Sequence, residues 1–222
     1  MLKGSKATEV LQEYDSEKKS GLKNAKIGDT VTFGSYHGSS KWKVLNKKDG
    51  KILLISEKCL DAMPYNTERE DVTWENSTIR AWLNGEFAEK AFSAKEFSSI
   101  ASTKLDNPKN TRFGGAEGGN ATTDKVFLLS YDEAKEYFPA EAKEKTGMTG
   151  YAQSKEIWYY TFRVEEGPCW WWWLRSPGLG QDMASIFYCN ENFFGGAAND
   201  GLTVETICAV RPAIWVDISK IK

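Results

Sequence analysis

The order of structural signals along the chain predicts a single α+β domain. Strand-like segments come first, capped helices follow, and apolar strands return at the end, which differs from the alternation of βαβ units. The chain has 222 residues, of which 41% are hydrophobic and 27% charged, so it can build one sizeable core. Residues 1–26 are expected to be a polar lead, either a marginal helix or flexible, and residues 27–218 to be the domain.

The first part of this domain is predicted to be an antiparallel meander. Residues 30–34 and 41–45 alternate polar and apolar side chains, as half-buried strands do. Asp49 and Gly50 form a hairpin turn signal, and residues 51–56 are the expected returning strand.

Serine caps predict the helices in the middle of the chain. Asn76 or Ser77 can cap a helix over residues 78–84, which Asn84-Gly85 is expected to close. A second short helix is expected around Phe87–Phe92. A serine followed three residues later by glutamate, the capping-box spacing, occurs at Ser93 with Glu96 and at Ser130 with Glu133.

The last third of the chain predicts buried strands joined by polar loops. Residues 171–174 are too apolar for an exposed strand and predict one buried on both faces. Further strands are expected over 184–188, 202–205 and 208–216, with a loop over 190–200. Pro212 favours an edge position or a bulge in the final strand.

Charge and composition exclude several classes of function. The chain has 29 Lys+Arg and 31 Asp+Glu, a net charge of −2, so it lacks the footprint of a nucleic-acid-binding domain. No apolar run approaches the roughly 18 residues of a membrane helix. Residues 1–21 lack the apolar stretch of a secretory signal, so we expect synthesis in the cytoplasm and no membrane insertion.

The rare residues predict no metal, no cofactor and no catalytic centre. His37 is the only histidine, and we expect it in a solvated loop between two strands. The cysteines contain no C-x-x-C pair, which predicts reduced, mostly buried thiols at Cys59, Cys169, Cys189 and Cys208. The glycine-rich loop at 113–119 and the acidic stretch at 57–75 lack the motifs of phosphate and calcium sites.

Two arginines in apolar strands are predicted to be structural. Arg175 and Arg211 are the only cations between Gly167 and Val216. A cation in such surroundings must be paired and hydrogen-bonded. We expect each to hold backbone carbonyls or an acidic partner and so lock the last strands together.

The segment from Leu179 to Cys208 has the composition of a recognition surface. It combines Tyr and Phe with Asn, Gly, Ser and Thr, and it contains no lysine, although the chain has 23. Phe193 and Phe194 are adjacent, so one of them would point outward from a strand. The alternative is an ordinary pair of core strands with a polar loop.

An ordered set of motifs resembles a bacterial domain family that ends in W-W-L-R-S-P-G and G-V-R-P-A-L-W. Here these motifs are W-W-L-R-S-P-G at 172–178 and V-R-P-A-I-W at 210–215, with Ala209 where the family usually has Gly. Earlier matches are W-K-V-L at 42–45, L-L-I-S at 53–56, W-E-N-S at 74–77, R-A-W-L-N at 80–84 and F-L-L-S at 127–130. The resemblance covers residues 27–218 and implies a C-type lectin-like fold, of the branch shared with formylglycine-generating enzymes.

Some members of that family resemble the variable proteins of diversity-generating retroelements. In those systems an error-prone reverse transcriptase randomises adenines in one C-terminal stretch, and the fold displays the altered side chains to a ligand. Randomised AAY codons cannot give Met, Gln, Glu, Lys or Trp. Between Leu179 and Cys208, the residues that randomised AAY codons cannot encode are Gln181, Met183, Glu191 and Glu205.

The resemblance implies a non-catalytic protein that binds a protein or glycan on another cell and is displayed on a phage particle or cell surface through a partner. The ligand site is predicted on one exposed face, at Ile186, Tyr188, Asn190, Asn192, Phe193, Phe194, Asn199, Asp200 and Thr203. The buried scaffold is predicted at Trp172, Trp173, Arg175, Arg211 and Trp215. The oligomeric state is left open.

Two alternatives remain at this point. A constant carbohydrate- or cell-wall-binding module would use Tyr188, Phe193 and Phe194 as stacking platforms. An oxidase of the formylglycine-generating type would need a cysteine pair for copper, for which Cys189 and Cys208 are the only candidates.

Overall fold

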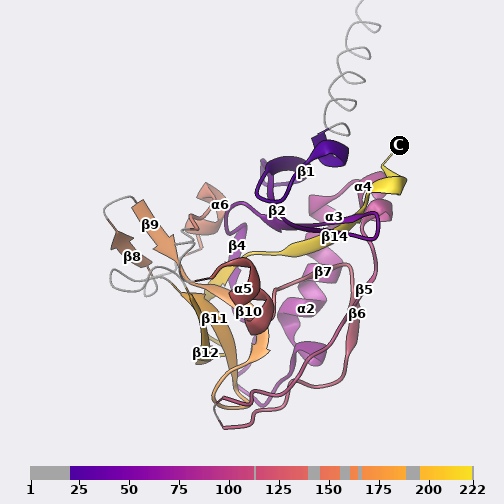
Figure 1. The fold of residues 1–222 in the computed structure, drawn as a ribbon. Coiled ribbons are helices and arrows are strands. Elements are labelled where there is room, and N and C mark those ends of the chain that lie inside the picture. The colour runs from indigo at the N-terminus through magenta and orange to yellow at the C-terminus, as the bar shows by residue number, and fades with distance from the viewer. Residues whose placement is uncertain are drawn as a thin grey trace, which may run out of the picture.

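The strands form two five-stranded sheets (Figure 1). The structure, a computed structural model, describes residues 21–112, 114–139, 146–155, 161–164, 167–188 and 196–221. The first sheet contains, in order, β1 (Thr30–Tyr36), β2 (Ser39–Lys48), β3 (Lys51–Ser56), β14 (Ala213–Asp217) and β7 (Val126–Phe127). The second contains β12 (Gly196–Thr203), β11 (Met183–Tyr188), β10 (Trp172–Pro177), β13 (Cys208–Val210) and β4 (Asp61–Met63). Two smaller ribbons pair β5 (Thr103–Leu105) with β6 (Thr122–Asp124) and β8 (Thr161–Val164) with β9 (Gly167–Trp170).

Short helices complete a mixed α+β fold, as the order of sequence signals predicts. They are η1 (Trp74–Asn76), α2 (Thr78–Trp82), η2 (Leu83–Phe87), α3 (Ala88–Ala91), α4 (Ala94–Ser99), α5 (Tyr131–Tyr137), α6 (Gly150–Gln153) and η4 (Ile218–Lys220). Ser77 caps α2, and both predicted capping boxes are present, at the starts of α4 and α5. The serine–glutamate spacing therefore located two helix starts correctly, and Ser77, one of two predicted candidates, caps a third.

The helix that begins at Thr78 does not end at Asn84-Gly85 as predicted. The helical backbone continues through η2 into α3, with a π-helical turn between them. Leu83 and Phe87 in this turn are completely buried. Burial of these two side chains outweighs the local tendency of Asn-Gly to stop a helix.

The meander and its turn form as predicted. Asp49 and Gly50 adopt φ angles of 50° and 70°, which belong to a tight hairpin turn between β2 and β3. β14 then pairs antiparallel with β3, from Ala213 opposite Ile55 to Asp217 opposite Lys51. The last strand therefore joins the meander in the first sheet.

Pro212 does not lie at an edge or a bulge of one long strand. It separates β13, in the second sheet, from β14, which lies between β3 and β7 in the first. Proline has no N–H to donate to a ladder, so pairing stops there and the chain passes from one sheet to the other. The carbonyl of Pro212 instead accepts a hydrogen bond from the Ser56 N–H, at 3.0 Å.

Arg211 joins the two places where the chain crosses between the sheets. Its side chain is 1% exposed. Nε donates to the carbonyl of Ser56 at 2.9 Å, and a terminal nitrogen donates to the Thr146 hydroxyl at 2.8 Å. The guanidinium also lies over the rings of Phe138 and Trp172. The predicted structural role of this cation is confirmed.

Arg175 ties β10 to the start of α5. Its side chain is 5% exposed, forms an ion pair with Glu133 and donates to the Leu128 carbonyl at 3.0 Å. The next residue, Ser176, accepts a hydrogen bond from the Tyr131 N–H at 2.9 Å. The adjacent Arg and Ser therefore dock the first turn of α5 on the second sheet.

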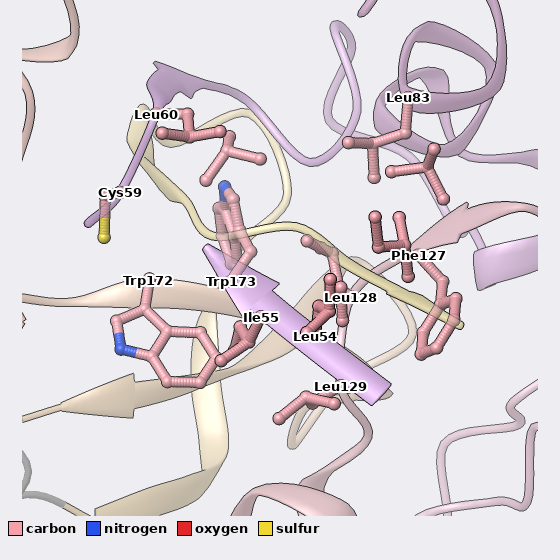
Figure 2. Close-up of a cluster of buried hydrophobic side chains, with 14 of the residues drawn as sticks. Leu54, Ile55, Cys59, Leu60, Leu83, Phe127, Leu128, Leu129, Trp172 and Trp173 are labelled. Carbon is pink, nitrogen blue, oxygen red and sulfur yellow. The ribbon is translucent and has the colours of Figure 1, made fainter. Parts of the chain in front are cut away.

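The paired tryptophans of β10 lie in the centre of the core. Trp172 and Trp173 are completely buried, and Figure 2 shows their rings on opposite sides of the strand. The Trp172 ring stacks on Phe187 with centroids 4.8 Å apart, and the Trp173 indole donates to the Met63 carbonyl at 3.0 Å. Trp215 departs from the predicted buried scaffold, because its side chain is only half-buried.

Two polar residues join the helices to neighbouring strands, one in β6 of the smaller ribbon and one through β7 of the first sheet. The buried Asp124 carboxylate accepts from the Trp74 indole at 3.0 Å and from Arg80 Nε at 2.8 Å. The Asn84 amide donates to the Val126 carbonyl at 2.9 Å, and its oxygen accepts from the Val126 N–H at 3.2 Å. Asn84 therefore pairs with β7 as a neighbouring strand would.

Buried thiols and phenols predict that the fold loses stability at alkaline pH. Burial raises the pKa of Cys59 from 9.0 to about 12, and it also raises those of Tyr65 and Cys208. These groups stay neutral when folded but ionise near their ordinary values when unfolded. Their stabilisation is complete below about pH 9 and is lost as the pH rises toward the folded pKa.

We therefore expect the free energy of unfolding in urea to be level between about pH 6 and pH 8. Above about pH 9 it should fall, by about 1.4 kcal/mol per pH unit for each group. Cys59→Ala should make this alkaline fall shallower. Equal slopes for the two proteins would contradict the assignment to Cys59.

Candidate functional site

The candidate recognition segment forms a hairpin at the edge of the second sheet. β12 is the outermost strand and pairs antiparallel with β11, and α5 packs against both strands (Figure 1). The predicted loop over 190–200 is therefore too long, because β12 already begins at Gly196. Residues 189–195 lie outside the described residues.

A bulge in β12 shapes this hairpin. Ala184 pairs with Leu202 and Ile186 with Ala198, so β12 has extra residues between the two pairs. Gly201 in the bulge has a φ of 71°, and a Cβ atom there would lie 2.0 Å from the Ala184 carbonyl oxygen. Only glycine fits this position.

The backbone of the hairpin is also held from outside. The carbonyl of Asp200 accepts from the Leu179 N–H at 2.9 Å, which docks the bulge on the turn after β10. The Gln181 side chain donates to the carbonyls of Val72 and Glu117 at 3.1 and 2.9 Å. The first contact uses main-chain groups, and the others use Gln181, which is not a predicted ligand position. None of them therefore depends on a predicted ligand side chain.

Ile186 is wrongly assigned to the exposed ligand face. Its side chain is 3% exposed. Ile186 pairs with the buried Trp173 of β10, and β12 covers the other side of β11. The sequence pattern around an isoleucine in an inner strand is the same whether that face of the sheet is covered or open to solvent. The burial of Ile186 was therefore decided by what packs on its face of the sheet.

Three other predicted ligand residues keep solvent exposure. Tyr188 is half-buried, with its ring 6.2 Å from that of Trp171. Asp200 is exposed in the bulge, and Thr203 is half-buried with its hydroxyl 3.0 Å from that of Thr206. Tyr188 lies at one end of the hairpin and Thr203 at the other, so these side chains are spread along it.

The remaining predicted positions are not described at side-chain level. Asn199 lies in β12, and only its backbone is described. Four predicted positions lie outside the described residues: Asn190, Asn192, Phe193 and Phe194.

A model of the family described as Domain of unknown function (DUF6273) matches residues 49–218. The chain belongs to this family. The match begins in the β2–β3 turn and ends one residue after β14, so the DUF6273 domain contains both sheet crossings and the β11–β12 hairpin. Comparison with curated proteins and with solved structures found no match.

Within the part of the DUF6273 protein that the structure describes, no helix is long and apolar enough to span a membrane. The same residues contain no group of three or more His, Cys, Asp or Glu side chains placed to hold a metal ion.

The cysteines of the DUF6273 domain that are described are deeply buried. Cys59 and Cys208 are free thiols, and Cys208 Sγ lies 3.3 Å from the carbonyl oxygen of Trp171. Burial raises the pKa of Cys208 well above 9.0, which disfavours the thiolate that a metal would require. Cys189 lies outside the described residues, and the side chain of Cys169 is not described.

A second cluster of titratable residues was not foreseen from the sequence. His37 is exposed in the turn after β1, as expected, and stacks on Tyr151 with ring centroids 3.5 Å apart. Next to it the Tyr36 hydroxyl donates to the buried Asp61 carboxylate at 2.6 Å, and Lys155 lies 3.8 Å from the same carboxylate. Burial, together with this hydrogen bond, raises the pKa of Tyr36. The cluster therefore tethers α6 to the meander.

Proposed function

We propose that this DUF6273 protein is a non-catalytic ligand-binding protein with a C-type lectin-like fold. Its ligand surface is the β11–β12 hairpin, where Tyr188, Asp200 and Thr203 contact a protein or glycan on another cell. One observation carries the proposal: main-chain hydrogen bonds hold the hairpin and Gln181 anchors the turn that leads into it, while these three side chains keep solvent exposure.

The strands around the hairpin support this division of labour. β10 contributes buried tryptophans and Arg175, and Arg211 follows directly after β13. A rigid scaffold lets intervening positions change without unfolding the domain. Tyrosine adds contact area at low entropic cost, and the small polar residues add adaptable hydrogen bonds.

In its finer form, the proposal makes this chain the variable protein of a diversity-generating retroelement. Gln181, which adenine randomisation of AAY codons cannot produce, is a residue whose side chain holds two other loops. Ile186 is buried and is therefore removed from the proposed variable set. DNA sequencing around the gene tests the retroelement proposal. A template repeat beside a reverse-transcriptase gene supports it. Absence of both favours the alternative, a binding module whose ligand surface does not vary.

The oxidase alternative has less support than ligand binding. Copper ligation by a cysteine pair needs thiolates that a metal can reach. Cys208 is buried, its sulfur faces the Trp171 carbonyl, and its pKa is raised. These features are those of a core thiol.

Replacing the exposed hairpin side chains should abolish ligand binding without unfolding the protein. Combined Tyr188→Ser, Asp200→Ser and Thr203→Ala should lower the free energy of unfolding by only about 1–3 kcal/mol, because Asp200 is exposed and Tyr188 and Thr203 are half-buried rather than core residues. The unmodified protein is first screened on a glycan array and on a panel of intact bacterial cells. The triple variant should lose the ligands found there.

Ile186→Ser is the matched control within the same hairpin. It places a hydroxyl in the core and should destabilise the protein by more than the triple variant does. Ligand binding that survives the triple change at full affinity would refute this surface. So would unfolding of the triple variant.

A further inference from the structure

A surface pocket lies on the first sheet, whereas the proposed ligand hairpin belongs to the second sheet. Its volume is about 240 Å³. Three separate segments form it: the β2–β3 turn, residues 102–104 after α4, and β14. Its lining residues are Lys48, Asp49, Lys51, Ser102, Thr103, Lys104 and Trp215.

Backbone contacts bring these segments together. The tight turn at Asp49-Gly50 places Lys48 directly opposite Lys51 in the β2–β3 ladder. The Ile218 N–H donates to the Gly50 carbonyl at 3.0 Å, and the Ala101 N–H donates to the Trp215 carbonyl at 2.8 Å. The pocket is therefore part of the folded framework.

The charge of the pocket is opposite to that of the chain. Three lysines and one aspartate give its lining a net charge of +2, whereas the whole chain carries −2. All three lysines are exposed, and within the described residues none of them forms an ion pair. Like charges held this close repel one another, and a bound anion relieves that repulsion.

Trp215 adds an apolar surface beside the charges. Its indole is half-buried, unlike the completely buried Trp172 and Trp173. A partly exposed aromatic ring in the lining of a pocket suits a planar or ring-shaped ligand. Hydroxyls at Ser102 and Thr103 offer hydrogen bonds at the rim.

We propose that this pocket binds an acidic glycan, with one uronic acid residue seated against Trp215. The sugar ring packs its C–H face on the indole, and its carboxylate lies among the lysine ammonium groups. Asp49 accepts hydrogen bonds from sugar hydroxyls. A nucleic acid fits less well, because its backbone presents mainly phosphate oxygens, which cannot donate to Asp49, whereas each uronic acid residue carries hydroxyls beside its carboxylate.

The test is titration calorimetry of the full chain with hexagalacturonate, with the neutral hexamer maltohexaose and with a six-nucleotide RNA. Hexagalacturonate should bind, more weakly as salt increases, and the other two should not. Trp215→Leu, and separately Lys48→Ser with Lys51→Ser and Lys104→Ser, should each weaken binding by at least about tenfold. Thermal melting confirms that both variants remain folded.

A second variant with three lysine substitutions controls for the loss of positive charge. Lys23→Ser, Lys95→Ser and Lys109→Ser remove the same charge from exposed positions outside the pocket and should leave binding unchanged. The proposal is overturned if hexagalacturonate does not bind, if both lysine triples weaken binding equally, or if the RNA binds more tightly through the same residues. Because the hairpin residues are unchanged in these variants, the result is independent of the proposed hairpin function.

Discussion

Trp173→Ala should lower the free energy of unfolding by about 3–5 kcal/mol, the range for truncating a large buried aromatic side chain. The Trp173 indole is completely buried, and its ring centroid lies 5.6 Å from that of Tyr65. It also donates to the carbonyl of Met63 at 3.0 Å, so its removal breaks that hydrogen bond as well. The effect is measured by urea and thermal denaturation. A chain of this size loses about 2–4 °C in Tm per kcal/mol.

Trp171→Ala is the control for this substitution. Trp171 is two positions earlier and only half-buried, so the same truncation removes less packing there. The loss of stability should be clearly smaller than for Trp173. Equal losses for the two variants, or an unchanged Trp173→Ala protein, would disprove that Trp173 is a central scaffold residue.

Glu133→Gln should cost about 2–4 kcal/mol. Removing one partner of a fully buried ion pair costs more, but Glu133 is 32% exposed, which weakens the pair. Arg175 is 5% exposed, and among the described residues its Nε has no hydrogen-bond partner, so loss of the carboxylate charge leaves a buried cation without its counter-charge. Glutamine preserves the capping box with Ser130, so the change removes the charge rather than the helix start.

Glu136→Gln controls for the loss of one negative charge from α5. Glu136 is exposed on the same helix, and its substitution should change stability by no more than about 0.5 kcal/mol. Urea denaturation of both variants gives the comparison. Matching values for the two variants would show that the Arg175–Glu133 pair contributes nothing beyond surface charge.

Local signals were sufficient where neighbouring residues supply the stabilising contacts. Ser93 and Ser130 cap their helices through glutamates three positions later, and Asp49-Gly50 makes the hairpin turn with its own backbone. These interactions close within one turn of chain. Sequence spacing alone therefore located them.

Signals failed where a distant segment competes with the local preference. Asn84-Gly85 has the composition of a helix end, yet the side chain of Asn84 hydrogen-bonds to Val126, which is 42 positions away. The helix continues so that Leu83 and Phe87 can fill the core. Pro212 likewise does not sit at an edge, because the two halves of the expected strand belong to different sheets.

The sequence by itself determined that Arg175 and Arg211 need partners, because a cation among apolar residues is too costly to leave unpaired. Only the tertiary structure decided which partners they have, and for Arg211 one is the Ser56 carbonyl, 155 positions away. The composition of the last third likewise pointed to a hairpin with exposed side chains, but the strands flanking it decided that Ile186 is buried and Asp200 exposed. The lysine pocket around Trp215 joins residues from three segments. Sequence periodicity relates only residues that are near one another along the chain. Only the packing of the sheets and turns therefore decided that this pocket exists.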